Sequence, residues 1–153
     1  MPEFLEKTVD KFTFRVATDR LYSPDGTWIL RMQGGAPGRV RVGLTDFMQQ
    51  RSGDVAFVSV KGPGTRLAAG DDLAQLETIK VNLGLPAPVS GTVAEVNEAL
   101  EPTPEVLNQD PYGKGWLAVI EVASWDDERA GLLDPAGYFA LMERQVEQEL
   151  AKP

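Results

Sequence analysis

Glycine and proline interrupt this chain so often that long regular elements fit only near its end. The chain has 153 residues, and its 15 glycines and 11 prolines are spread along it instead of clustering in a linker. Short apolar runs bounded by turn residues are typical of β-strands. Many short strands of this kind favour a mainly β sandwich or barrel. We predict strands at residues 12–17, 28–32, 40–44, 55–60, 73–81, 92–96 and 117–122.

Helix signals occur at three places. Thr45 is a good N-cap for a short helix that stops at Gly53, and Pro104 lies near a second helix start. The third segment begins near Pro135 and carries apolar side chains at helical spacing as far as Leu150. We expect this tail to be a helix packed on the sheet, because an amphipathic helix usually covers a core.

The chain contains neither cysteine nor histidine. Disulfides, cysteine-based metal sites and thiol catalysis are therefore excluded. A Ser-His-Asp triad, an imidazole metal ligand and a histidine acid or base are excluded as well. We expect no metal site and no catalytic residue.

The charge of the chain bears on its partners. It carries 15 basic and 23 acidic residues, a formal net charge of −8. An acidic surface repels phosphate backbones, so we expect basic protein surfaces as partners, and neither nucleic acid nor membrane. No apolar run approaches the ~20 residues of a membrane span, and the N-terminus lacks the pattern of a signal peptide. These features predict a cytoplasmic protein.

Three polar segments resemble functional motifs but are better interpreted as turns. The carboxylates at residues 71–72 and 126–128 lie in hydrophilic surroundings, whereas an acid/base pair needs one carboxyl in an apolar pocket. The segment 62–64, Gly-Pro-Gly, lacks the rest of a phosphate loop, and its proline removes an N–H group that a phosphate would need. We therefore interpret the protein as a non-enzyme.

Lys80 is the residue whose surroundings indicate a function. A Gly-Asp turn at residues 70–71 leads into the strand that ends near Lys80, and Gly91 follows on the way out. This pattern predicts a hairpin with Lys80 at its tip. A lysine held out on a rigid hairpin suits the attachment of a swinging arm, whose chemistry belongs to the cofactor and to partner enzymes.

Here the sequence resembles the H protein of the glycine cleavage system, a lipoyl carrier, from about Leu21 to about Leu141. Glu77-Thr78-Ile79-Lys80 corresponds to the family's Glu-Ser-Val-Lys, whose lysine carries lipoate. Biotin carriers are less similar, since they usually place methionine on both sides of the lysine. The matching blocks, in order, are 42–49, 53–58, 77–80, 87–91, 95–100, 104–108, 110–117 and 132–138.

The resemblance implies a flattened β-barrel, or barrel-sandwich hybrid, with short helices and a C-terminal helix. It also implies lipoate attached to Lys80 and, for Glu77, recognition by the modifying ligase. The arm would move an aminomethyl group and reducing equivalents between a pyridoxal-phosphate glycine decarboxylase, an aminomethyltransferase and dihydrolipoyl dehydrogenase. The expected organisation is an N-terminal extension at 1–20, the carrier domain at 21–142 and a helical extension at 143–153.

Some residues depart from the family pattern and leave alternatives open. The His-Glu-Trp of the family is replaced by Gly-Thr-Trp at 26–28, Val-Asn-Leu-Gly follows the lysine, and residues 34–38 form an insertion. The alternatives are a lipoate carrier for another redox pathway, such as heterodisulfide-reductase-like sulfur oxidation, and an unmodified scaffold. Four aromatic residues have two interpretations, a groove that shelters the loaded arm or ordinary core: Trp28, Tyr112, Trp116 and Tyr138.

Overall fold

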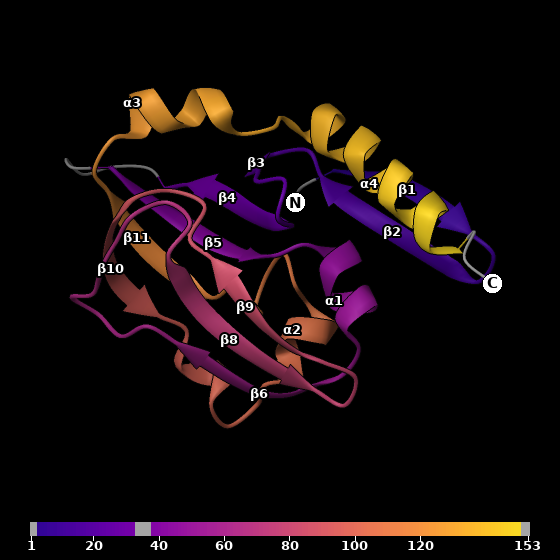
Figure 1. Cartoon of the computed structure of the whole chain (residues 1–153), viewed down its shortest axis with the longest axis horizontal. Helices are drawn as coiled ribbons and strands as arrows, with labels where there is room; N and C mark the ends of the chain where they lie inside the picture. Colours follow the sequence, from indigo (N-terminus) through magenta and orange to yellow (C-terminus); the bar gives the residue numbers. More distant parts are fainter. Residues whose placement is uncertain (1–2, 33–37, 151–153) are drawn as a thin grey trace.

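The computed structural model describes residues 3–32 and 38–150, the side chain of Leu150 excepted. Within these residues the chain is mainly β, with helices concentrated in its last third (Figure 1). The strands are β1 Phe4–Val9, β2 Phe12–Ala17, β3 Leu21–Tyr22, β4 Thr27–Arg31, β5 Arg39–Leu44, β6 Val55–Val60, β7 Arg66–Leu67, β8 Asp72–Thr78, β9 Asn82–Pro86, β10 Gly91–Val96 and β11 Ala118–Val122. The α-helices are α1 Asp46–Ser52, α2 Val106–Gln109, α3 Trp125–Glu128 and α4 Pro135–Leu150, and short 3₁₀ turns span Glu98–Leu100 and Arg129–Gly131.

The strands form two sheets and one separate hairpin. The larger sheet has the order β3-β4-β5-β11-β10-β7, and the smaller has the order β6-β8-β9. The described pairings are all antiparallel, as expected for strands joined by short turns. The hairpin β1–β2 pairs with neither sheet and projects from the body of the molecule (Figure 1).

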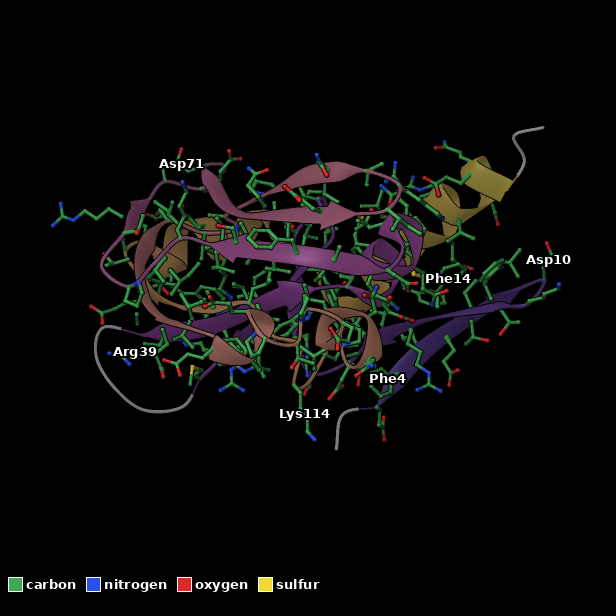
Figure 2. All side chains as sticks on the ribbon, turned by 90° about the horizontal axis from the view of Figure 1, so that it is seen from below. Phe4, Asp10, Phe14, Arg39, Asp71 and Lys114 are labelled. Atoms are coloured by element: carbon green, nitrogen blue, oxygen red, sulfur yellow. The ribbon has the colours of Figure 1, made fainter. Side chains whose placement is uncertain are left out.

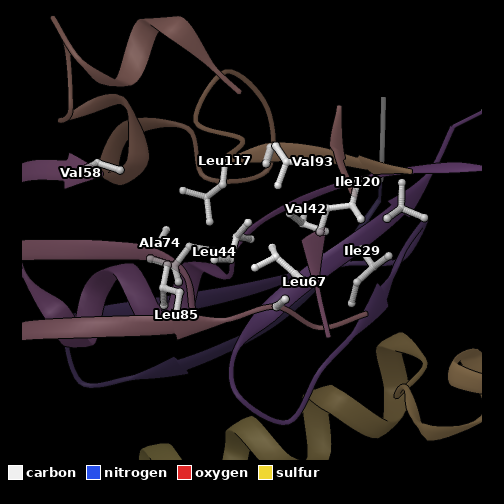
Figure 3. Packing of buried hydrophobic residues seen from close by; sticks show 14 of the residues in the cluster. Ile29, Val42, Leu44, Val58, Leu67, Ala74, Leu85, Val93, Leu117 and Ile120 are labelled. Carbon is white, nitrogen blue, oxygen red and sulfur yellow. The ribbon is translucent and has the colours of Figure 1, made fainter. Parts of the chain in front are cut away.

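The main core lies between the two sheets. It combines side chains of the larger sheet, such as Val42 and Ile120, with Leu85 of the smaller one, each at most 1% exposed (Figure 3). Leu76 of the smaller sheet belongs to the same cluster. This packing confirms the predicted mainly β sandwich, and in the described part of the chain no ladder closes it into a barrel. Burial on this scale is the main stabilising term of such a fold.

A second core joins the hairpin β1–β2 to α1 and α4. Phe14 from β2, Phe47 from α1 and Val146 from α4 pack together, and the rings of Phe14 and Phe47 meet edge to face with centroids 5.7 Å apart. Figure 2 shows Phe14 between the hairpin and the end of α4. Tyr22 and Tyr138 stack at 4.6 Å at the other end of this core. The N-terminal hairpin β1–β2 and the C-terminal helix α4 therefore pack on each other.

Most sequence expectations for the elements are confirmed, with two corrections. Thr45 caps α1 by accepting a hydrogen bond from Met48 N, and Gly53 ends the helix with φ of 84°. The tail is a helix as predicted, but it packs mainly on β1, β2 and β3 and not across a large sheet, because the projecting hairpin offers it an apolar face. The strand predicted at 73–81 ends at Thr78, since the chain reverses there.

Other expectations concern the ends, the insertion and membranes. The insertion predicted at 34–38 lies, apart from Gly38, outside the described residues. Helix α4 runs without a break through the expected boundary at residues 142 and 143. In the described ranges, no helix is both long and apolar enough to cross a membrane.

Candidate functional site

Lys80 lies at the tip of the β8–β9 hairpin, as the sequence predicted. Glu77 and Asn82 are the last cross-strand pair before the reversal, which leaves residues 78–81 for the turn. The side chains of the tip point to solvent, with Ile79 82% and Val81 46% exposed. Single exposed apolar side chains are common on protein surfaces, so this exposure alone assigns no binding role. The tip therefore presents a lysine between two apolar neighbours.

Thr78 holds this turn in one shape. Its hydroxyl accepts hydrogen bonds from Lys80 N at 3.2 Å and Val81 N at 3.0 Å, and it donates to Val81 O at 3.0 Å. The Thr78 backbone N–H bonds the same carbonyl at 2.9 Å. A hydroxyl that satisfies the backbone of the following residues is the usual device of a short polar turn. Thr78 is a positioning residue that sequence reasoning did not single out, although serine and threonine in turns are a signal for it.

The Lys80 side chain lies against the C-terminal end of α1. A Cβ placed on Gly53 would be 3.4 Å from Lys80 Cδ and 3.5 Å from its Cε, which are ordinary van der Waals separations, so the lysine methylenes run alongside this glycine. Among the ion pairs of the described residues, none involves the Lys80 ammonium group. Acylation of this nitrogen would break no ion pair found there.

Asn108 fixes the segment on which Lys80 rests. Its Oδ1 accepts a hydrogen bond from Val55 N at 2.9 Å, and its Nδ2 donates to Gly53 O at 3.0 Å and to Gln49 Oε1 at 3.1 Å. One side chain from α2 thus joins the end of α1 to the start of β6. Because Val55 on β6 pairs with Thr78 on β8, this anchor also fixes the tip end of the hairpin that carries Lys80.

A pocket of about 190 Å³ opens beside Lys80. It lies between the β1–β2 hairpin, α1 and the last turns of α4, and its wall is mostly aromatic and aliphatic. Arg51 and Glu149 form an ion pair of 2.7 Å at this wall. The lining residues are Phe12, Phe14, Phe47, Gln50, Arg51, Lys80, Val146 and Glu149.

The four aromatic residues proposed for an arm-sheltering groove do not line this pocket. Trp28 and Tyr138 have no exposed surface and belong to the second core. The indole Nε1 of Trp28 donates to Pro111 O at 2.9 Å. Tyr112 and Trp116 line other surface hollows. Trp28 and Tyr138 are therefore ordinary core residues, and the aromatic residues that line the pocket beside Lys80 are phenylalanines.

Glu77 is an exposed residue of β8, three positions before Lys80. Its cross-strand neighbours are Phe57 on β6 and Asn82 on β9. Phe57 is 55% exposed. A protein that binds this hairpin would thus contact a carboxylate, an aromatic ring and the lysine at the tip, all on paired strands.

The acidic clusters have structural roles, as the sequence indicated. Asp71 Oδ2 accepts a hydrogen bond from Ala68 N at 2.8 Å within a turn. Glu128 accepts from Ser90 N at 2.8 Å and from Ser90 Oγ at 2.9 Å, which ties α3 to the loop before β10. Within the described residues, no group of three or more acidic side chains could hold a metal ion.

Comparison with known proteins identifies the family. The family described as Glycine cleavage H-protein matches residues 20–145. A glycine cleavage system H protein of Carboxydothermus hydrogenoformans is 39% identical over 132 residues, covering 86% of this chain and 98% of the relative. That of Cronobacter sakazakii is 41% identical, covering 84% and 96%. The chain belongs to the glycine cleavage H-protein family.

A solved structure supports the same family. The crystal structure of a glycine cleavage system H protein from Mycobacterium marinum superposes with a TM-score of 0.69 at 34% sequence identity, covering 80% of this chain and 95% of that chain. H proteins carry lipoate covalently on a lysine and are carrier components instead of catalysts. Family membership makes this chain a lipoyl-carrying shuttle that acts with other glycine cleavage components. The lysine at the hairpin tip fits such a group, because the residue is exposed and the turn around it is fixed.

Proposed function

We propose that Lys80 is the lipoyl attachment site, through which the arm carries an aminomethyl group and reducing equivalents between glycine cleavage enzymes. The observation that carries the proposal is the position of Lys80 at the tip of a hairpin whose turn is fixed by the Thr78 hydroxyl. When bound, lipoate supplies a disulfide that can be opened, loaded and reoxidised.

The residues of this chain present and orient the arm. The β8–β9 ladder presents the tip beside the C-terminal end of α1, and Asn108 fixes the segment beneath it. Amide formation at Lys80 removes a positive charge, so the modified tip is an apolar projection flanked by Ile79 and Val81. A projection of this kind can enter several active sites in turn while the carrier remains folded.

The proposed partners are a pyridoxal-phosphate glycine decarboxylase, an aminomethyltransferase, dihydrolipoyl dehydrogenase and a lipoate ligase or lipoyl transferase. The net charge of −8 supports transient docking to basic patches, since charge complementarity speeds encounter without holding the partners tightly. The relatives described above are glycine cleavage proteins and do not favour a sulfur-oxidising pathway.

Intact mass and peptide mapping of the protein purified from its native host test the attachment site. We expect a lipoyl-sized mass increment on the peptide that contains Lys80. Lys80→Arg should abolish the increment, whereas Lys114→Arg, at another exposed lysine, should leave it in place. An unmodified Lys80 in cells whose other lipoyl proteins are modified would refute the proposal and favour an unmodified scaffold.

Glu77 is the proposed recognition residue for the ligase. Glu77→Gln should lower the rate of lipoylation several-fold without changing the melting temperature, because the side chain is exposed. Glu95→Gln is the matched control, since Glu95 is an exposed strand residue on β10, outside the sheet that carries Lys80. Equal rates of lipoylation for the two variants would refute the role of Glu77 in recognition by the ligase.

A further inference from the structure

Strand β6 has one free edge. The smaller sheet has the order β6-β8-β9, so β6 pairs with β8 on one side and with no described strand on the other (Figure 1). Lys61 N donates to Leu73 O across the ladder at 2.9 Å. Because backbone groups alternate in direction along an antiparallel strand, the N–H and C=O groups of Val58 and Val60 point away from β8. In the described part of the chain, no hydrogen bond uses these outward groups.

This edge lacks the features by which proteins usually protect an edge strand. Native sheets blunt their edges with short strands, charged side chains or prolines. β6 is six residues long, Val55–Val60, and contains neither a charged residue nor a proline. By contrast, β3 and β7 at the ends of the larger sheet have two residues each, and β9 ends in Pro86. The N–H of Val55 already bonds Asn108 Oδ1, so the second half of β6 is the part that can pair with another strand.

A groove of about 580 Å³ runs along this edge. One wall is β6 from Phe57 to Val60, and the other is made of residues between Val96 and Glu101, in the segment that follows β10. Leu100, 3% exposed, and the half-buried Val96 supply apolar surface, and the exposed Phe57 adds an aromatic ring. The groove therefore offers backbone hydrogen-bonding groups on one wall and apolar surface on the other.

The charge of the groove is negative. Glu98 and Glu101 line it, and both are exposed. Among the ion pairs of the described residues, none involves either carboxylate. Lys61, the first cation after β6, does not line the groove. An extended segment with lysine or arginine beside apolar residues is therefore attracted to this edge, whereas a second copy of β6 with its own two glutamates is repelled.

We propose that the free edge of β6 is a docking site for an extended, basic segment of a partner protein, which adds to the three-stranded sheet as a further strand. Backbone hydrogen bonds supply affinity in this mode of binding, and the groove with its carboxylates supplies specificity. Val55 pairs with Thr78, two residues before Lys80, so the added strand is held by the sheet that carries the lysine. Docking at β6 does not require lipoate on Lys80 and goes beyond the function proposed above.

A synthetic peptide tests the docking site on the full chain. The probe is a short peptide of alternating lysine and valine, blocked at both ends, and its affinity is measured by isothermal titration calorimetry. A comparison peptide has the same sequence and charge but carries a methyl group on every backbone nitrogen. It should bind about tenfold more weakly or worse, because it cannot donate hydrogen bonds to the edge of β6.

Two changes in the protein locate the site. Val60→Pro removes one outward N–H and keeps the ladder to β8, since an edge strand tolerates proline where its N–H faces solvent. Glu98→Gln combined with Glu101→Gln removes the charge of the groove. Each change should weaken binding of the lysine–valine peptide about fivefold or more. The controls are Val60→Thr, which keeps the N–H, and Glu95→Gln combined with Glu105→Gln, which changes the net charge equally outside the groove, and both should leave the affinity unchanged.

Hydrogen exchange gives a readout that needs no variant. On addition of the lysine–valine peptide, the amide protons of Val58 and Val60 should exchange about fivefold more slowly or less, because they become hydrogen-bonded. The amide protons of β9, at the opposite edge of the sheet, should not change.

Three results would overturn the docking site. Equal affinity for the two peptides would show attraction by charge alone. Unchanged affinity of the Glu98 and Glu101 variant, or unchanged exchange at Val58 and Val60, would place the peptide elsewhere. Slower exchange at Val58 and Val60 on concentrating the protein without peptide would assign the edge to a second copy of the chain.

The mass of the Lys80 peptide separates this docking site from the proposed function. A protein that carries lipoate on Lys80 but does not bind the lysine–valine peptide refutes the docking site alone. A protein without lipoate that binds the peptide at β6 refutes the attachment site alone.

Discussion

Asn108 offers a stringent test of how the site is held in place, since one side chain joins three backbone or side-chain groups. Asn108→Ala removes the hydrogen bonds to Val55 N, Gly53 O and Gln49 Oε1, which are 2.9, 3.0 and 3.1 Å long. Each bond contributes about 1 kcal/mol net. Asn108 is half-buried, so water replaces part of the loss, and we expect the free energy of unfolding to fall by about 2 kcal/mol. For a chain of this size that lowers the melting temperature by about 4–8 °C.

Urea unfolding followed by circular dichroism measures this loss. Asn82→Ala is the control, because Asn82 is exposed next to the tip of the β8–β9 hairpin, and it should change stability by less than about 0.5 kcal/mol. Asn108→Asp should cost at least as much as Asn108→Ala, since a carboxylate oxygen would then face the Gly53 carbonyl. A loss below about 0.5 kcal/mol for Asn108→Ala, with an unchanged m-value, would refute the role of Asn108 as an anchor.

Two further predictions concern the core. Gly91→Ala should prevent folding or cost more than about 3 kcal/mol, because a Cβ there would lie 2.2 Å from a backbone oxygen of the facing strand. Gly62→Ala, with open space around it, is the control, and equal stability of the two variants would contradict the argument. Burial raises the pKa of Tyr138 to about 12 and also raises the pKa of Tyr22 and Tyr112. The folded state therefore binds these phenol protons more firmly than the unfolded chain, whose tyrosines have a pKa of ~10. The contribution of the buried tyrosines to the free energy of unfolding is fully present below that pH and is lost as the pH rises toward 12. The tyrosinate absorbance should thus rise together with unfolding, and a gradual rise near pH ~10 in folded protein would contradict the expected burial of these groups.

The sequence predicted the central fold well because its strands are locally marked. Turn residues bracket each apolar run, and the sharp reversal between Thr78 and Asn82 follows from the strand pattern around it. The start of α1 at Thr45 and its end at Gly53 were also predicted from the sequence, since both residues form hydrogen bonds with backbone groups three or four positions away. Structural features that depend on interactions between residues close together in the chain can be predicted from the sequence.

The N-terminal hairpin illustrates what the sequence did not show. Only β2 was predicted as a strand, because the half-buried residues of β1 alternate weakly between apolar and polar. The turn between them is Asp10-Lys11, and Asp10 adopts φ of 55° without the glycine that usually marks such a turn. The alternation of Phe12, Phe14 and Val16 is the sequence signal that could have indicated an apolar face on this hairpin.

The pocket was missed for a different reason. Its aromatic wall comes from β2 and α1, and its last residues come from α4, so it exists only once the two ends of the chain meet. Sequence reasoning chose tryptophan and tyrosine as arm-sheltering residues. Trp28, Tyr112 and Tyr138 instead form hydrogen bonds elsewhere, as Trp28 does with Pro111 O.

The packing of β1–β2 on α4 has a consequence for how this protein is trimmed or compared. The family match stops short of both ends, yet Phe14 and Val16 share one apolar cluster with Met142 and Val146. Removing either the hairpin β1–β2 or α4 would therefore expose the apolar face of the other to solvent. The two tails behave as a single accessory module split across the termini, to be gained, lost or transplanted only as a pair.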